Sequence, residues 1–209
     1  MINNYLEFKK FLNEEIKTDY KPTLLIHSCC GPCSSHVLTL LQDYFNIRIF
    51  YYNPNIYPIS EFKKRLKEQQ RLIQDMKLDI QVVEGQYDYK LYLNQVKGLE
   101  KEGERSQRCY NCYEFRIKEA YEYAKKHHFN YYTTTLSISP YKNSDWINEI
   151  GNKYQDENCK YLYSNFKKEN GYQHSIKLSE QYHLYRQEYC GCEFSLAEHE
   201  EMLRKKQAL

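Results

Sequence analysis

Seven of the eight cysteines in this chain lie in three short clusters. The clusters are Cys29-Cys30-x-x-Cys33, Cys109-x-x-Cys112 and Cys190-x-Cys192. In a reducing compartment, clustered thiols are typical of metal or redox chemistry rather than of a structural disulfide framework. We therefore expect all three clusters to have chemical roles, and we interpret the isolated Cys159 as an ordinary buried thiol.

Two kinds of chemistry fit these thiols. Four thiolates can hold a Zn²⁺ ion or an iron–sulfur cluster, and the adjacent pair Cys29 and Cys30 favours the separated irons of a cluster. The segment Cys190-Gly191-Cys192 can close a small, strained disulfide, which is readily reduced, and Gly191 supplies the backbone freedom that such a ring needs. The residues therefore indicate a metal centre beside a redox-active dithiol, and hence an electron-transferring enzyme.

The charge of the chain is nearly balanced. It has 209 residues, with 30 Lys and Arg against 28 Asp and Glu, for a net charge of +2. This balance excludes a strongly basic tail, but a local basic face can still bind nucleic acid. No apolar run reaches the roughly 18 residues that cross a bilayer, and the N-terminal MINNYLEFKKFLNEE has no apolar signal-peptide core. We expect a cytoplasmic protein without membrane contact.

Apolar periodicity and turn residues predict an alternating order of elements. Strands are expected at residues 23–27, 47–52, 78–83, 131–136 and 160–164. Helices are expected at residues 34–45, 60–76, 88–96, 113–127, 146–154, 179–187 and 195–205. Ser60 is expected to cap the second helix, and Ser195 with Glu198 to form a capping box at the last. The alternation predicts one α/β domain over residues 1–209, with a parallel sheet flanked by helices.

This order also places the cysteines. The first cluster falls where the first strand passes into the first helix, and the other two immediately precede helices at 113–127 and 195–205. Ligands of open α/β sheets bind at the carboxyl ends of the strands, so we expect the metal site at that edge. The partial positive charge of a helix N-terminus favours thiolates, the form that binds metal and attacks disulfides.

The chain resembles a known family in six long strings. They are LLIHSCCGPCSS (24–35), FYYNPNIYPISEFKKR (50–65), RCYNCYEFRI (108–117), TTTLSISPYKN (133–143), SNFKKENGYQHS (164–175) and LYRQEYCGCEFS (184–195). In this order they are similar to the epoxyqueuosine reductases called QueH. The resemblance implies a Rossmann-like fold of the adenine-nucleotide alpha-hydrolase (HUP) type with C-terminal helices. The Ser-Gly-Gly-x-Asp-Ser phosphate loop of ATP-using relatives is absent, and residues 28–34 take its place, which argues against adenylation chemistry.

The resemblance implies a function in tRNA. The family reduces the epoxide of epoxyqueuosine at the wobble position, the last step of queuosine formation, with an iron–sulfur cluster and without cobalamin. Carried over by motif, the [4Fe-4S] ligands are Cys29, Cys30, Cys109 and Cys112, and the redox-active pair is Cys190 and Cys192. An additional mononuclear iron at Cys33 with Cys192 is a further expectation. The partners are tRNA carrying epoxyqueuosine and an electron donor that the sequence does not identify.

The reaction itself sets chemical demands. Converting an epoxide to an alkene consumes two electrons and two protons and releases one water. The departing oxygen needs a Lewis acid or a proton donor. An iron with an open coordination site could bind that oxygen, and either the cluster or the Cys190 and Cys192 dithiol could supply the electrons.

Other polar residues have two interpretations each. Substrate contact is a hypothesis for five of them, which otherwise satisfy turns or face solvent: Asn53, Asn55, Tyr57, Lys142 and Arg186. Surface lysines such as Lys167 and Lys168 either clamp phosphates or are solvated. Tyr141, Tyr172 and Tyr185 either stack on anticodon bases or pack in the core.

Three further alternatives remain open from the sequence. His27 is either a hydrogen-bonding neighbour of the metal site or a core histidine. Glu61 and Arg65 either contact substrate or form surface pairs at a helix start. At the level of function, the rivals are a structural zinc module that binds tRNA and a thiol–disulfide oxidoreductase that acts on proteins through Cys190 and Cys192.

Overall fold

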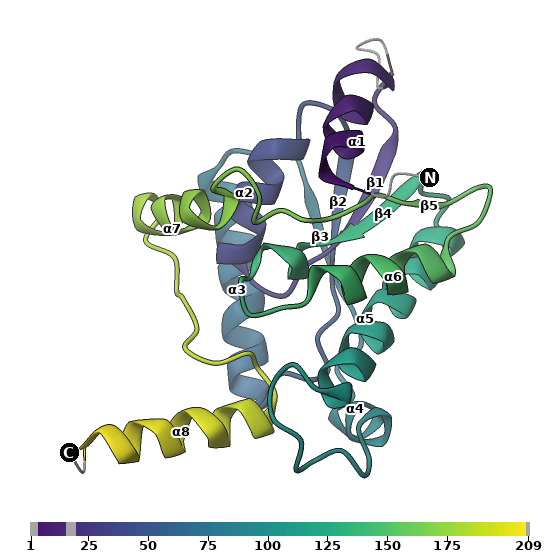
Figure 1. The fold of residues 1–209 in the computed structure, drawn as a ribbon. Helices are drawn as coiled ribbons and strands as arrows, with labels where there is room; N and C mark the ends of the chain where they lie inside the picture. The colour runs from purple at the N-terminus through teal and green to yellow at the C-terminus, as the bar shows by residue number, and fades with distance from the viewer. Residues whose placement is uncertain (1–3, 16–19, 208–209) are drawn as a thin grey trace.

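The computed structural model describes residues 4–15 and 20–207, which contain a five-stranded sheet (Figure 1). Its strands are β1 (Thr23–His27), β2 (Asn46–Tyr51), β3 (Gln81–Glu84), β4 (Tyr131–Thr134) and β5 (Lys160–Tyr161). All neighbours pair in parallel, in the order β3-β2-β1-β4-β5. The prediction of a parallel α/β fold is therefore confirmed, and β1, which leads into the first cysteine cluster, is the central strand.

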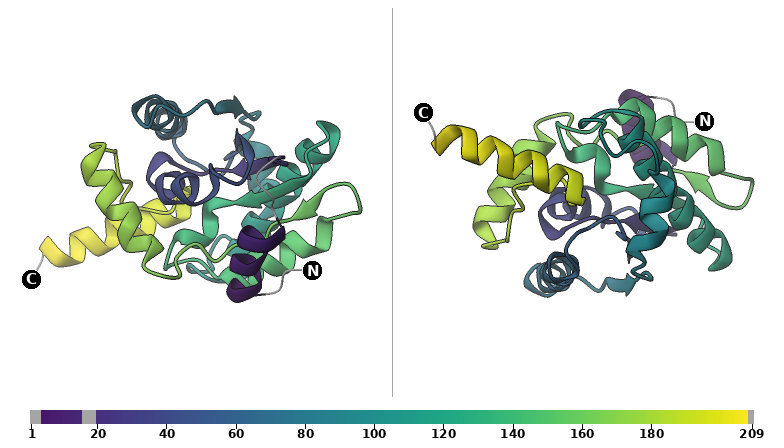
Figure 2. Two further views of the ribbon diagram at one scale, coloured as in Figure 1. Left: turned by 90° about the horizontal axis from the view of Figure 1, so that it is seen from above. Right: turned by 90° about the horizontal axis from the view of Figure 1, so that it is seen from below.

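Helices cover both faces of the sheet (Figures 1 and 2). They are α1 (Tyr5–Lys10), α2 (Gly31–Leu41), α3 (Ile59–Asp75), α4 (Tyr89–Gln95), α5 (Gln107–Lys126), α6 (Ser144–Tyr154), α7 (Gly171–Gln181) and α8 (Glu193–Gln207). A π-helical turn (Phe11–Glu15) follows α1, and a 3-10 turn (Thr135–Ile138) follows β4. Figure 1 shows α8 extending away from the sheet. Among the described residues, no helix combines the length and the apolar character needed to cross a bilayer.

Alternate residues of β1 supply two hydrophobic cores. Leu24 and Ile26 pack against α1, α2 and α3 on one face, and Leu25 packs against α5 and α6 on the other. All three side chains are fully buried. A central parallel strand is buried on both faces, which is why this strand reads as an unbroken apolar run. The two cores fix the sheet, and the sheet in turn brings the loops after β1, β2 and β4 to one edge.

Two helices begin at residues other than those predicted. α2 begins at Gly31 rather than at residue 34, because Pro32 suits the first turn of a helix, so Cys33 lies inside that turn. α3 begins at Ile59 with Pro58 as its N-cap, and the prediction that Ser60 caps it was wrong. Three strands are also shorter than predicted: β3 begins at residue 81, β4 ends at 134 and β5 ends at 161.

The helices nearest the cysteines also needed correction. α5 begins at Gln107, so Cys109 and Cys112 lie in its first turns and do not precede it. The helix predicted at 179–187 was wrong, because α7 ends at Gln181 and residues 182–192 are irregular. The left-handed conformation of His183, with φ of 48°, accompanies this helix end.

The predicted capping box was wrong as well. α8 begins at Glu193, which places Ser195 inside the first turn. The Ser195 hydroxyl donates to the Cys192 carbonyl at 2.9 Å. Glu198 instead accepts from the buried Arg108 at 3.1 Å. These contacts attach the start of α8 to α5, beside the third cysteine cluster.

Candidate active site

A cavity of about 460 Å³ lies where α2, α5 and the segment before α8 meet. Its lining includes a thiol from each cluster, in the set Cys29, Cys33, Cys109 and Cys190. Clusters that are far apart in sequence therefore surround one cavity. The topology explains this, because the first cluster directly follows the central strand β1 and the carboxyl ends of parallel strands share one edge.

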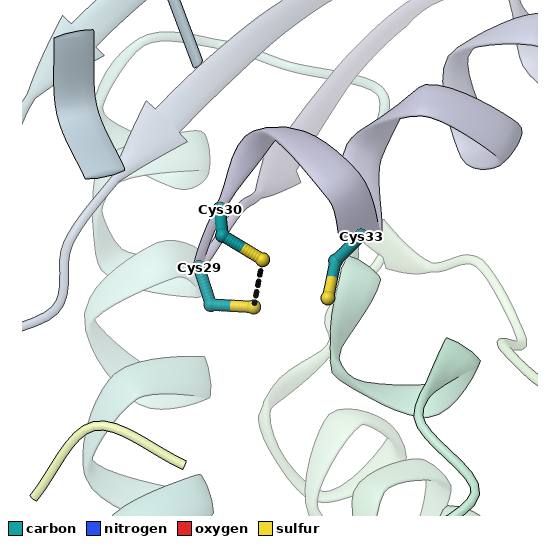
Figure 3. A group of neighbouring side chains, drawn as sticks. All are labelled: Cys29, Cys30 and Cys33. Atoms are coloured by element: carbon teal, nitrogen blue, oxygen red, sulfur yellow. Dashed lines mark hydrogen bonds between the residues drawn. The ribbon is translucent and has the colours of Figure 1, made fainter. Parts of the chain in front are cut away.

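The thiols of Cys29, Cys30 and Cys33 point toward one another (Figure 3). The Sγ atoms of Cys29 and Cys30 are 3.7 Å apart, and all three sulfurs lie within 4.8 Å of one another. Cys30 is the N-cap of α2 and Cys33 lies in its first turn, so the start of this helix gathers the side chains. Sulfurs bound tetrahedrally to one ion, at about 2.3 Å each, lie about 3.8 Å apart. This group therefore has the spacing of a metal site.

The three thiols differ in acidity. Hydrogen bonds from Cys30 and Cys33 hold the pKa of Cys29 well below its ordinary value. The bond to Cys29 raises the pKa of Cys30 to about 12, and bonds to Cys29 and Cys30 raise the pKa of Cys33 as well. Without a metal, Cys29 is thus the most acidic of the three thiols. Metal binding at such a group releases the remaining protons.

A second group of thiols lies between α5 and the segment before α8. Cys112 and Cys192 are buried together with Tyr92 and Val96. Burial raises the pKa of Cys109, and the charge of Cys190 raises it further. Since the pKa of Cys112 responds to Cys190 in the same way, the second and third clusters are electrostatic neighbours. All eight cysteines of the chain are free thiols in this structure.

Gly191 has the backbone freedom that the sequence predicted. Its φ of 136° lies in the region that favours glycine. A Cβ atom added there would also lie 3.2 Å from Nη1 of Arg65. The positive φ and the close approach of this guanidinium together favour glycine between Cys190 and Cys192.

Arg65 holds the segment that carries Cys190 in place. Its side chain is 1% exposed, and Nε donates to Glu61 at 2.7 Å. Nη1 donates to the Cys190 carbonyl at 3.2 Å, and Nη2 donates to the Tyr189 carbonyl at 3.4 Å. α3 is thereby tied to the third cysteine cluster. Of the two sequence interpretations of Arg65, surface pairing and substrate contact, neither describes this buried positioning role.

Two cations lie among the thiols. Arg116 is buried, donates to the Cys112 carbonyl at 3.2 Å, and its Nη2 has no hydrogen-bond partner among the described residues. Lys142 is half-buried and lines the cavity. Burial alone would lower the pKa of Lys142, but the negative charges of Cys190, Tyr113 and Cys29 raise it.

Thiol donors together with these buried positive charges fit a metal centre whose thiolate ligands carry net negative charge. Gln187 adds a contact that the sequence analysis did not anticipate. Its Nε2 donates to Sγ of Cys30 at 3.2 Å. Hydrogen bonds to ligand sulfurs are one of the ways in which proteins set the reduction potential of iron–sulfur centres.

The family described as "Epoxyqueuosine reductase QueH" has a sequence model that matches residues 24–198. The chain belongs to this family. An epoxyqueuosine reductase QueH from Staphylococcus epidermidis is 36% identical over 201 residues, covering 93% of this chain and 84% of the relative. Another, from Thermotoga maritima, is 35% identical over 195 residues, covering 88% of this chain and 97% of the relative. The resemblance seen in the six sequence strings is therefore confirmed.

A solved structure shares the fold. It is the U34-tRNA thiolase NcsA from Methanococcus maripaludis with its [4Fe-4S] cluster. The TM-score is 0.50 at 14% identity, and the match covers 98% of this chain and 76% of the thiolase. At this identity the likeness concerns the arrangement of the sheet and helices. The likeness therefore agrees with the parallel α/β fold described above.

The five substrate-contact candidates occupy different environments. Lys142 and Arg186 line the cavity. Asn53 and Asn55 are buried, and Asn53 donates to the Ser28 carbonyl at 2.7 Å. Tyr57 is 40% exposed, and its backbone N–H donates to the Gly191 carbonyl at 2.8 Å. The NPNIY loop thus packs against the first and third cysteine clusters of this QueH family member.

Burial decides the interpretation of His27 and of Cys159. His27 is fully buried between Thr134 and the Tyr52 carbonyl, at 2.8 and 3.0 Å, and burial lowers its pKa to about 4. It is therefore a neutral core histidine, whose Nε2–H donates to the carbonyl. Cys159 is 1% exposed within the core between α5, α6 and the sheet, which confirms its interpretation as an ordinary buried thiol.

Proposed function

We propose that this chain reduces the epoxide of epoxyqueuosine in tRNA to the alkene of queuosine, the activity for which its relatives are named. The observation that carries the proposal is the single cavity lined by thiols of all three cysteine clusters in a member of the QueH family. The expected setting is the cytoplasm, with tRNA as partner, no cobalamin and a separate electron donor. The absence of a membrane-spanning helix among the described residues is compatible with this setting.

Within this proposal, Cys29, Cys30, Cys109 and Cys112 hold a [4Fe-4S] cluster. Each ligand of such a cluster binds a different iron, so the four sulfurs need not crowd together as around one ion. The cations Arg116 and Lys142 support a negatively charged centre here. When bound, the cluster would supply single electrons and Lewis acidity.

The alternative to a disulfide between Cys190 and Cys192 is an additional iron shared by Cys33 and Cys192, because a thiol that binds iron cannot also be part of a disulfide. Cys33 lies with the first cluster, within 4.8 Å of Cys29 and Cys30. Cys192 packs against Cys112, and its thiol donates to the Ser195 hydroxyl at 3.4 Å. Metal analysis of Cys33→Ala tests this iron, because loss of one iron without loss of sulfide is expected.

The chain's own thiols can supply the two electrons and two protons that the reaction consumes. Oxidation of the Cys190 and Cys192 dithiol to a disulfide releases two electrons and two protons. The epoxide takes up both, its two carbon–oxygen bonds break, and the oxygen leaves as water. A reductant of the dithiol or low-potential electron-carrier class then restores the thiols. Lys142 places a positive charge in the cavity, where it can stabilise negative charge on the departing oxygen.

Nucleoside analysis of tRNA from a strain that lacks this protein tests the activity. We expect epoxyqueuosine to accumulate and wild-type protein to restore queuosine. Normal queuosine in the deletion strain, with no second reductase present, would overturn the proposal. Complementation by Cys190→Ser should fail, and full complementation would remove the dithiol from the reaction.

Anaerobic purification separates the proposal from its two rivals. A brown protein with iron, inorganic sulfide and broad absorbance near roughly 400 nm is expected for a cluster. A colourless protein with one equivalent of zinc would indicate a structural zinc module. Thiol–disulfide exchange on proteins that proceeds without iron and without tRNA would indicate the oxidoreductase instead.

A further inference from the structure

Two cations, Arg105 and Lys167, contact the loop between β4 and α6, and this loop forms part of the rim of the cavity. Arg105 and Tyr141 both line the cavity. The Arg105 Nε donates to the Tyr141 carbonyl at 3.2 Å, and the Lys167 Nζ donates to the next carbonyl, that of Lys142, at 3.0 Å. One short loop therefore holds a guanidinium and an ammonium on adjacent peptide units. We name Arg105, Tyr141 and Lys167 the rim cluster.

The rim cluster has little compensating negative charge. In the part of the chain that the structure describes, neither Arg105 nor Lys167 forms an ion pair with a carboxylate. Burial and the charges of Arg105, Lys168 and Lys142 lower the pKa of Lys167, although Asp145 opposes them. Glu104, next to Arg105, also lines the cavity. Because these like charges repel one another, binding of an anionic ligand beside them is favourable.

An exposed aromatic ring accompanies these charges. Tyr141 is 63% exposed, and the Arg105 guanidinium carbon lies 6.0 Å from its ring centre. Its side chain is therefore not part of the core, which was one of its two sequence interpretations. A flat exposed ring beside unpaired cations matches the two parts of a nucleotide, a base that stacks and a phosphate that carries charge. An acidic peptide would use the cations but would leave the ring without a role.

We infer that the rim cluster binds the RNA strand beside the nucleotide in the cavity, with Arg105 and Lys167 on a phosphodiester and Tyr141 stacked on the adjacent base. This inference rests on the proposed function, because it takes the ligand to be tRNA. It deepens that function by giving the strand an anchor outside the thiol centre. The cavity then admits only a nucleotide that has left the stack of its neighbours.

Direct binding of a fluorescein-labelled anticodon stem-loop RNA tests the inference without any catalytic turnover. The full chain is titrated by fluorescence anisotropy over a series of KCl concentrations. Arg105→Gln and Lys167→Gln remove a charge while keeping an amide that can donate to the loop carbonyls. Each should weaken binding several-fold and reduce the slope of log affinity against log salt by about 0.7. Tyr141→Ala should weaken binding about tenfold, and Tyr141→Phe should retain it.

The matched control is Lys126→Gln, because this exposed lysine ends α5 at the opposite end from Cys109. It should bind like the wild type. Wild-type affinity and salt slope in all rim variants would overturn the inference while leaving RNA binding intact. Displacement of RNA by inorganic phosphate at constant ionic strength would also overturn it, since it would indicate a free-phosphate site. A wild-type chain that does not bind the RNA at all would instead contradict the proposed function.

Discussion

Arg65 illustrates how a single buried charge organises the site. It joins Glu61 on its own helix to the carbonyls of Tyr189 and Cys190, which lie far away in sequence. Because its side chain is 1% exposed and that of Glu61 is 11% exposed, water cannot replace these partners. Removing one member of such a pair leaves the other charge buried and uncompensated.

Arg65→Met should therefore lower the free energy of unfolding by about 3 kcal/mol. It should also slow the conversion of the epoxide to the alkene, because the Cys190 carbonyl loses its hydrogen-bond donor. Urea unfolding under reducing, anaerobic conditions measures the first effect. The control is Arg204→Met, whose pair with Glu200 spans 3.9 Å at 80% exposure and should contribute less than about 1 kcal/mol. Equal effects of the two substitutions would contradict this account of Arg65.

A pair of histidines makes stability depend on pH. Nδ1 of His36 on α2 lies 2.9 Å from Nδ1 of His174 on α7, and burial, followed by the charge of His174, lowers the pKa of His36 from 6.5 to about 4. Below pH 6.5 the unfolded chain binds this proton more readily than the folded chain. The stabilising contribution is thus complete above that pH and is lost as the pH falls toward 4.

His36→Gln keeps a hydrogen-bonding group that does not titrate. We expect the difference in Tm between about pH 7.5 and pH 4.5 to be smaller in His36→Gln than in the wild type, by a few degrees for an effect near 1 kcal/mol. Thermal unfolding followed by circular dichroism across this range provides the comparison. Parallel curves of Tm against pH would show that the pair does not contribute.

At the scale of residues, the sequence identified the candidate functional cysteines but not the side chains that hold them in place. The cysteines were found because their clustering is local. Arg65 and Arg116 were missed as buried charges, although each lies on a helical stripe with buried neighbours such as Phe62 and Ala120. The sequence signal that could have identified both arginines as buried is a charged residue on the apolar face of a helix. The partner of Gln187, the Cys30 sulfur, could not be predicted, because it depends on how residues 182–192 cross the first cluster.

At the scale of elements, close packing depends on small residues at particular contacts. α6 lies against β5, and a Cβ atom at Gly151 of α6 would clash with the ring of Tyr161 on β5. The Tyr132 hydroxyl also donates to the Gly151 carbonyl at 2.6 Å. Gly151 therefore sets how closely this helix approaches the edge of the sheet.

Gly151→Ala should lower the free energy of unfolding by about 1–3 kcal/mol through overpacking, while metal content stays at the wild-type value. Gly103→Ala is the control, because an added Cβ there meets no atom within 4 Å. That variant should be neutral or slightly stabilising. Denaturant midpoints of the three proteins give the comparison, and an unchanged Gly151→Ala midpoint would contradict the packing argument.

The alternation of strands and helices was predictable, whereas helix ends near the site were not. β1 was located correctly because a strand buried on both faces has a continuous apolar signature. The start of α5 was missed because its first turn, QRCYNC, carries no strong apolar stripe. The irregular segment 182–192 resembles a helix in composition, but its contacts with α3 and the first cysteine cluster override that local preference.

For the whole molecule, most of the two hydrophobic cores lies away from the thiol centre, although Cys29 and Cys30 belong to the core between the sheet, α5 and α6. The two cores lie between the sheet and its helices, and the cavity lies at the sheet's carboxyl edge. The fold should therefore form without metal, and a bound metal should add stability because it binds the folded chain preferentially.

Removing metal with a chelator under anaerobic, reducing conditions should leave the far-UV circular dichroism spectrum nearly unchanged at 25 °C and lower the Tm. Restoring iron and sulfide should return the Tm to its starting value. Collapse of the helical signal on chelation at 25 °C would show that the metal is required for folding, as in zinc fingers, and would contradict the expectation that the two cores alone hold the fold.

Folding gathers distant thiols around one cavity, and epoxide reduction at this site is the activity that we propose. Its most direct test is incubation of tRNA carrying epoxyqueuosine with purified chain, loaded anaerobically with iron and sulfide, and an excess of dithionite. Mass spectrometry of the digested tRNA should show loss of one oxygen and formation of queuosine. Epoxyqueuosine that persists unchanged, although the protein holds its full iron and sulfide and binds the tRNA, would contradict the account.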